Sequence, residues 1–192
     1  MAATRAFIAI EVEETILERL RAVQQHLRTA GAQVTWVREE GMHLTLKFLG
    51  DIEDDHLPEI TRLLQCATST VTPFPFSVAH IGGFPTIAHP RVLWAGISDG
   101  AGTLCALADA VAKQLASCGF PREDRSFTPH ITLGRVKSLT DNHLPELLRA
   151  HAEDIYGEMS VSEIHLMRSE LSPAGARYTI LQVIPLDSGC RI

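Results

Sequence analysis

The chain has 192 residues, of which 45% are hydrophobic and 21% are charged, and its formal net charge is −6. This composition is typical of a globular protein with enough apolar residues for its own core, so no disulfide framework or structural metal is needed to hold it together. The negative net charge argues against broad, non-specific binding of long nucleic acid, which requires many lysines and arginines. A small local basic pocket remains compatible with it.

The sequence also indicates where the protein works. No stretch approaches the roughly 18 apolar residues of a membrane span, so we expect no membrane association. The opening run, MAATRAFIAIEVEE, has a short apolar segment followed at once by acids, which is typical of a first strand and not of a signal peptide. The four cysteines form no CxxC pair, and we expect reduced thiols in a cytoplasmic protein.

Hydrophobic periodicity predicts strands and helices interspersed along the whole chain. In chain order the expected elements are a strand at 7–12, a helix at 13–29, strands at 33–37 and 43–49, a helix at 54–67, strands at 74–81 and 91–97, a helix at 103–117, a strand at 130–136, a short helix at 143–152, and strands at 161–168 and 176–184. A loop rich in glycine and proline is expected at 82–90. This order of elements favours an α+β fold.

A four-residue motif occurs twice, as HLTL at 43–46 and as HITL at 130–133, so the two copies lie 130 − 43 = 87 residues apart. We call it the HxTx word. A shift of 87 residues also lays Leu17 on Leu104 and Leu20 on Leu107. Each half then reads as a strand, an amphipathic helix and a strand with the HxTx word. This agreement predicts an internal duplication with a pseudo-two-fold relation inside a single bilobal domain spanning residues 1–192. Such an arrangement could bring the two HxTx strands together at a central cleft.

The HxTx word suits phosphoryl chemistry. Because side chains alternate along a strand, His43 and Thr45 share one face, and His130 and Thr132 share another. Opposed faces of this kind would line a cleft with two imidazoles and two hydroxyls. Near neutral pH one histidine can accept a proton from water while the other donates a proton to the leaving oxygen. The hydroxyls and Arg135 can hold phosphate oxygens, but the pseudo-symmetry leaves the order of acid and base open.

Other interpretations of these residues compete with a catalytic one. A single HxT strand is more often an ordinary core or surface element, and only the matched pair favours a site. His43 and His130 could ligate a metal, but neither word contains an acidic ligand and the chain has no HExxH motif, so we expect no metal and no cofactor. The seven other histidines are predicted to be core or surface residues. Phe48 and Trp94 could stack a base but are predicted to be core, because they lie within apolar strands.

At these residues the chain resembles the two-histidine (2H) phosphoesterases. It is most similar to their bacterial and archaeal branch, the RNA 2′,3′-cyclic phosphodiesterases, first named 2′-5′ RNA ligases. The resemblance covers nearly the whole chain, and the segments that carry it are RAFIAIEV, WVREEGMHLTLKFLGDI, PRVLWAGI, GFPREDRSFTPHITLGRVK and LMRSELSPAGARYTIL.

The resemblance implies a bilobal α+β fold with antiparallel sheets flanked by helices around a central cleft. It implies metal-independent hydrolysis of RNA 2′,3′-cyclic phosphate ends to 2′-phosphates, with His43 as proton donor and His130 as proton acceptor. Thr45, Thr132 and Arg135 would hold the phosphate. The substrates would be RNA 3′ ends, including tRNA-derived ones, or small cyclic nucleotides, and a monomer is the default expectation.

Two other functions remain open at this point. The same site run backwards would act as a 2′-5′ RNA ligase that joins a cyclic phosphate to a 5′-hydroxyl. A module that binds RNA ends or nucleotides without turnover would use the same side chains only as hydrogen-bond donors.

Overall fold

The computed structural model describes residues 3–124, 126–139, 143–172 and 175–187. Its elements are β1 (Ala3–Glu11), α1 (Glu14–Arg28), β2 (Gln33–Trp36), β3 (His43–Glu53), α2 (Leu57–Thr68), β4 (Phe74–Phe84), β5 (Val92–Ile97), α3 (Ala101–Ala116), β6 (His130–Ser138), α4 (Leu144–Ala150), β7 (Ile155–Val161), β8 (Glu163–Ser172) and β9 (Gly175–Pro185). Short 3-10 turns at Glu39–Gly41 and Asp54–His56 precede β3 and α2. The expected α+β class is confirmed.

One curled nine-stranded sheet connects the whole molecule. Its order is β7-β4-β5-β6-β3-β1-β8-β9, with β2 beside β6, and the strand pairs are antiparallel. A shift of 87 residues carries β1 onto β5, β3 onto β6 and β4 onto β8. These strands stand in mirrored order on either side of the contact between β6 and β3, so the duplication read from the sequence is confirmed.

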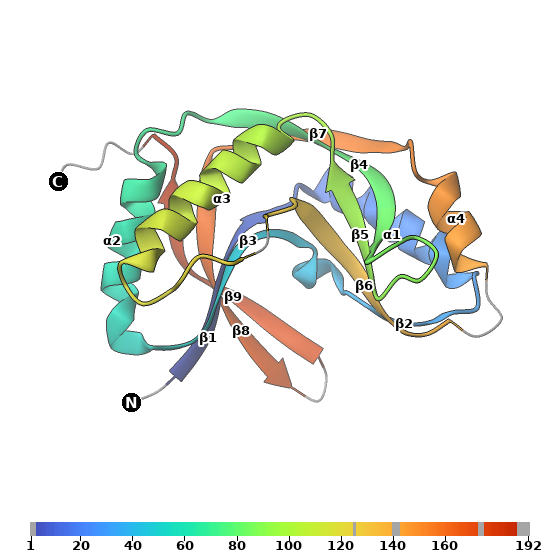
Figure 1. Cartoon of the computed structure of the whole chain (residues 1–192), viewed down its shortest axis with the longest axis horizontal. Coiled ribbons are helices and arrows are strands. Elements are labelled where there is room, and N and C mark those ends of the chain that lie inside the picture. The colour runs from blue at the N-terminus through green and yellow to red at the C-terminus, as the bar shows by residue number, and fades with distance from the viewer. Residues whose placement is uncertain (1–2, 125, 140–142, 173–174, 188–192) are drawn as a thin grey trace.

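The helices form two groups at opposite ends of the sheet. At one end α2 and α3 pack against each other and against β9 and β3, and at the other end α1 and α4 pack together and against β7 and β4 (Figure 1). Helix α1, which follows β1 in the chain, therefore packs on β7 from the second half of the sequence, and helix α3, which follows β5, packs on β3 from the first half. Each lobe is thus built from both halves of the sequence.

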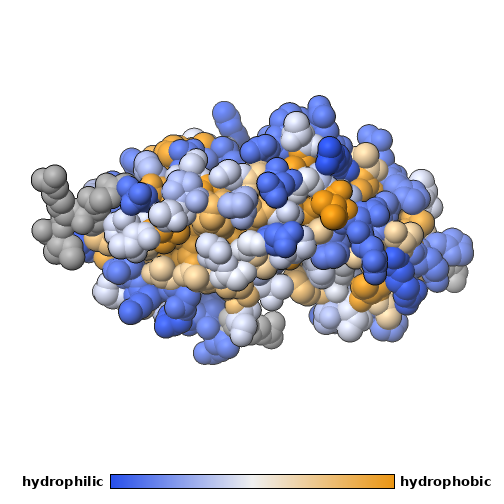
Figure 2. Space-filling view, turned by 90° about the horizontal axis from the view of Figure 1, so that it is seen from above, coloured by the Kyte–Doolittle hydropathy of each residue, from blue (hydrophilic) through white to orange (hydrophobic). Residues whose placement is uncertain are grey.

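The apolar faces that the sequence predicted form the core. Leu20, Leu104 and Leu107, the matched helical leucines, are buried, as are Leu44 and Leu133 from the two HxTx strands. Seen from above, hydrophilic residues are spread over the whole face among smaller hydrophobic areas (Figure 2). Among the described helices, none combines the length and apolar character needed to cross a membrane.

The structure adds one strand and lengthens several others, among them β3, which runs to Glu53, and β4, which runs to Phe84. Strand β7 was not predicted from the sequence, because its alternation is irregular: Ile155 is 71% exposed, and Gly157 has a φ of 148°. Strand β4 runs through Gly82 into what was predicted as a loop. A Cβ atom on Gly82 would lie 2.3 Å from the Trp94 ring, so the glycine there allows the ring to lie against the strand. Among the described residues, Cys105 and Cys118 are free thiols, whereas Cys190 lies outside them.

Candidate active site

The two HxTx strands are neighbours at the centre of the sheet. Leu44 of β3 pairs with Ile131 of β6, and both side chains are 0% exposed. Residues that face each other in an antiparallel pair project from the same side of the sheet, and their chain neighbours project from the opposite side. The chain neighbours of Leu44 and Ile131 therefore share the side opposite the core, and their side chains are those of His43, Thr45, His130 and Thr132.

The register of this contact sets the spacing of the two imidazoles. In a regular continuation of the ladder His43 would face Thr132, and Thr45 would face His130. Residues on the diagonal of such a ladder lie about 7–8 Å apart, so a regular ladder would place the backbones of the two histidines diagonally across the strand pair, with both side chains on the same side of the sheet. Beyond this contact β6 pairs with β2 instead, and β3 and β6 diverge.

A β-bulge in each lobe changes the side of the sheet to which the residues after the HxTx word point. In β6 the partners of Thr132 and Gly134 are consecutive residues of β5, so Leu133 is the extra residue. Its carbonyl accepts hydrogen bonds from the Gln24 side chain of α1 at 2.8 Å and from the backbone N–H of Val37 at 3.0 Å. The bulge shifts the alternation by one residue. Arg135 consequently reaches the same side of the sheet as Thr132.

The first lobe has the same bulge at the equivalent position. In β3 the partners of Thr45 and Lys47 are consecutive residues of β1, so Leu46 is the extra residue. Phe48, which corresponds to Arg135 after the shift of 87, is therefore turned toward the outside of the core and is 64% exposed. The prediction that Phe48 is a core residue was wrong, because strict alternation from Thr45 does not hold across a bulge. Trp94 is partly buried and packs beside Phe84.

A pocket of about 810 Å³ lies on this side of the sheet. Its lining includes Thr45, His130, Thr132 and Arg135, together with Phe48 and Phe84. A volume of this size suits a nucleotide-sized ligand. The pocket thus brings together four of the five site residues predicted from the sequence, and it supplies hydroxyl and guanidinium donors next to two aromatic rings.

His130 is held in one orientation. Its Nδ1 lies 2.7 Å from the backbone carbonyl oxygen of Thr128, and its ring makes an edge contact with Phe84 at 5.1 Å between centroids. A carbonyl oxygen can only accept, so Nδ1 carries the proton. In the neutral ring the lone pair is then on Nε2, and this nitrogen can accept a proton.

His43 does not line the pocket itself but rests on an apolar cluster beside it. Its ring stacks on Phe7 at 4.7 Å and meets the edge of Tyr178 at 5.2 Å. Its Nδ1 is buried and has no hydrogen-bond partner among the described residues. Burial lowers the pKa of His43 to about 4, because a charged ring would lose its hydration there.

Electrostatics connect the two parts of the site. Burial raises the pKa of Tyr178, and the positive charge of Arg135 partly offsets that effect. An arginine of the pocket is therefore close enough to act on the tyrosine that contacts His43. Neither Phe7 nor Tyr178 was predicted as a site residue from the sequence. The signal available for Tyr178 was its place in the closing hairpin segment RYTIL, which lies within the resemblance.

Two other cations near the HxTx words have different roles. Lys47 is buried, and its Nζ donates a hydrogen bond of 2.8 Å to the carbonyl of Pro121, so it holds the segment that leads to His130. Arg122 is paired with Asp109. Within the described residues one group of three side chains could ligate a metal, namely Glu53, Asp55 and His56. All three are exposed and none lines the pocket.

A duplicated antiparallel sheet that places two HxTx strands side by side above such a pocket defines a two-histidine phosphoesterase. Comparison with known proteins agrees with this class. The family model of the 2′-5′ RNA ligase superfamily matches residues 9–173, and the chain belongs to this family.

Relatives match over nearly the whole chain. A protein of Methanothermobacter thermautotrophicus named RNA 2′,3′-cyclic phosphodiesterase is 36% identical over 183 residues, which cover 95% of this chain and 98% of the relative. A protein of the same name from Aquifex aeolicus is 35% identical over 185 residues, covering 95% and 97%. A crystal structure of a Thermus thermophilus protein superposes with a TM-score of 0.79 at 28% identity, covering 95% of this chain and 98% of the other.

Proposed function

We propose that this protein hydrolyses 2′,3′-cyclic phosphates at RNA 3′ ends to 2′-phosphates, without a metal, by acid–base catalysis from His43 and His130. The observation that carries the proposal is the contact between β3 and β6, which turns both HxTx words to the same side of the sheet. The pocket beside it offers the donors that a phosphate needs. The relatives named RNA 2′,3′-cyclic phosphodiesterase support this choice of substrate.

In the proposed reaction Thr45, Thr132 and Arg135 hold the non-bridging phosphate oxygens. Water attacks phosphorus and gives a proton to Nε2 of His130. The bond from phosphorus to the 3′ oxygen breaks, and His43 donates a proton to that oxygen. One proton is taken up and one is released, so the pair of histidines must exchange protons with solvent before the next turnover. Fixed donors around the phosphate stabilise the charge that spreads over its oxygens in the transition state.

The hydrogen bond from His130 Nδ1 to Thr128 supports His130 as the acceptor, because it fixes the tautomer whose Nε2 carries the lone pair. His43 is the proposed donor although burial lowers its pKa to about 4. Binding of an anionic phosphate favours the protonated ring, so the substrate itself would bring His43 into its acidic form.

The ligase reaction uses the same groups with an RNA 5′-hydroxyl in the place of the attacking water, while the 3′ oxygen still leaves. The name of the superfamily favours keeping this second candidate. Water is present at about 55 M, so joining requires the second RNA end to be held at a high effective concentration. We therefore place hydrolysis first, with tRNA-derived ends and small cyclic nucleotides as candidate substrates.

The test is incubation with a nucleoside 2′,3′-cyclic phosphate followed by phosphorus NMR. We expect a 2′-phosphate product, unchanged turnover in EDTA, and a loss of about 10²–10⁴ in rate for each of His43→Ala and His130→Ala. His56→Ala is the matched control, because this histidine is exposed and outside the pocket. A 3′-phosphate product, or activity that survives both active-site substitutions, would contradict the proposal.

A further inference from the structure

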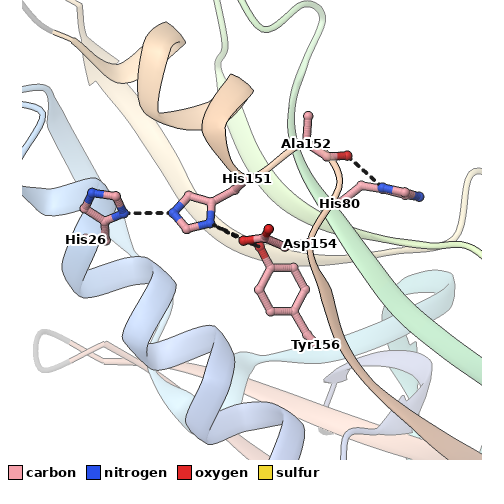
Figure 3. Close-up of polar contacts among 6 residues, drawn as sticks. All are labelled: His26, His80, His151, Ala152, Asp154 and Tyr156. Atoms are coloured by element: carbon pink, nitrogen blue, oxygen red, sulfur yellow. Dashed lines mark hydrogen bonds and ion pairs between the residues drawn. The ribbon is translucent and has the colours of Figure 1, made fainter.

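A second group of histidines lies away from the pocket, between α1 and α4. His26 is in the last turn of α1, and its Nδ1 lies 2.8 Å from Nε2 of His151, which follows α4. Nδ1 of His151 lies 2.7 Å from a carboxylate oxygen of Asp154. The Tyr156 hydroxyl lies 3.5 Å from the same oxygen. Figure 3 shows His26, His151 and Asp154 in one row, with Tyr156 below Asp154, and none of these side chains lines the pocket.

The protons in this row can be assigned from the acceptors. The ionised carboxylate of Asp154 only accepts, so Nδ1 of His151 carries a proton and its Nε2 carries a lone pair. His26 then donates its own Nδ1 proton to that lone pair. A carboxylate behind an imidazole fixes the ring and makes its far nitrogen more basic, and most histidines that ligate metals are supported in this way.

The protein backbone holds His151 in place. Its carbonyl accepts from the N–H of Ile81 at 3.1 Å, and the carbonyl of Asp154 accepts from the N–H of His80 at 2.9 Å. His80 has a φ of 61° and also contacts the carbonyl of Ala152 at 2.8 Å through Nδ1. A non-glycine residue in this backbone region costs energy and persists only when its surroundings fix it. The His151 side chain is 15% exposed, so its position is set before any ligand arrives.

We propose that His26 and His151 form a binding site for a divalent transition metal that prefers imidazole, such as Zn²⁺. Tetrahedral Zn²⁺ with Zn–N distances of 2.0–2.1 Å separates two ligand nitrogens by about 3.3 Å. The present 2.8 Å between Nδ1 and Nε2 is close to that spacing. On binding, His26 shifts its proton from Nδ1 to Nε2, both facing nitrogens offer lone pairs to the metal, and water fills the remaining positions.

The site would join the two halves of the sequence, because α1 belongs to the first half and α4 to the second. The proposed metal ion takes no part in catalysis. Removal of the metal is therefore expected to lower thermal stability and to leave turnover unchanged. This separates the proposal from that of the function, which is tested by product formation.

The experiment is equilibrium dialysis of the full chain against Zn²⁺ after treatment with EDTA, combined with thermal unfolding. We expect one zinc ion per chain and a rise in Tm of about 5–10 °C when free zinc is 100-fold above Kd. His26→Gln and His151→Ala should each remove that ion and the rise in Tm. Glutamine at 26 keeps an N–H donor for His151, and circular dichroism checks that both variants are folded.

Two control variants locate the ion. His56→Ala removes one member of the exposed group Glu53, Asp55 and His56, and His43→Ala with His130→Ala removes the active-site imidazoles. Both controls should still bind zinc as the wild type does. Absence of bound zinc in the wild type would overturn the proposal, and so would zinc that stays bound in His26→Gln or is lost in either control.

Discussion

We expect His43 to be neutral in the free protein near pH 7 and to gain its proton when a phosphate anion binds. Its ring lies on Phe7 and beside Tyr178, and burial lowers its pKa to about 4. At pH 7 only about one molecule in a thousand would then carry the proton. A proton donor in this state is almost inactive.

The bound anion can restore the proton. A single negative charge about 4 Å from the imidazolium, at an effective dielectric constant of 20, contributes about 4 kcal/mol. That energy favours the protonated ring by a factor of about a thousand. The two effects are similar in size and opposite in sign, so roughly half of the complexes would hold a protonated His43 at pH 7.

The assay is a pH titration of the His43 ring proton by NMR, with the resonance assigned from His43→Gln. The protein is titrated alone and when saturated with a nucleoside 2′-monophosphate, which represents the product. We expect a midpoint near pH 4 for the free protein and a clearly higher one for the complex. A free-state midpoint near the ordinary value of 6.5 would refute the argument from burial. A midpoint that the ligand leaves unchanged would refute the placement of the phosphate beside this ring.

Three further predictions concern the chemistry and the pocket. With a 4-nitrophenyl phosphodiester, whose leaving group needs no proton, His43→Ala should lose far less rate than with a cyclic nucleotide, whereas His130→Ala should lose as much. Equal losses in the two variants would contradict the assigned roles. Phe48→Ala should raise KM for a cyclic nucleotide about tenfold with little change in kcat, because base stacking is worth about 1–3 kcal/mol, and Phe48→Tyr should restore it. Arg135→Lys should lower kcat/KM about 10–100-fold, measured by initial rates, since lysine loses the bidentate contact with phosphate oxygens.

The sequence predicted the parts of the site that follow from local rules. Strand alternation placed His43 with Thr45 and His130 with Thr132, and the burial of Leu44 and the other apolar partners agrees with it. The repeat at a distance of 87 predicted two equivalent lobes. The contact between the two strands was a step beyond alternation, because only the strand order of the whole sheet puts β3 next to β6.

The remainder depends on pairing with distant strands. The bulge at Leu46 exists because β1 skips this residue, and no pattern within HLTLKF marks it. Phe48 was therefore assigned to the core when it faces solvent at the pocket. The residues that surround His43 come from β1 and β9, more than 30 residues away in each direction along the chain, and the periodicity of β3 carries no information about them.

These distant residues turn a symmetric sequence into an asymmetric site. The two words place their histidines at equivalent positions, yet the ring of His43 lies against aromatic side chains and Nδ1 of His130 donates to a carbonyl. The same shift of 87 sets Phe48 in one lobe against Arg135 in the other. Burial disfavours the charge on His43, and in the proposed reaction Arg135 holds the anion at the second HxTx strand. Hydrolysis needs one donor and one acceptor at the same phosphorus, and a pair of identical environments would not distinguish them. The duplication therefore supplies two imidazoles on one side of the sheet, and their surroundings distinguish them, because one ring lies against aromatic side chains and the other donates to a backbone carbonyl.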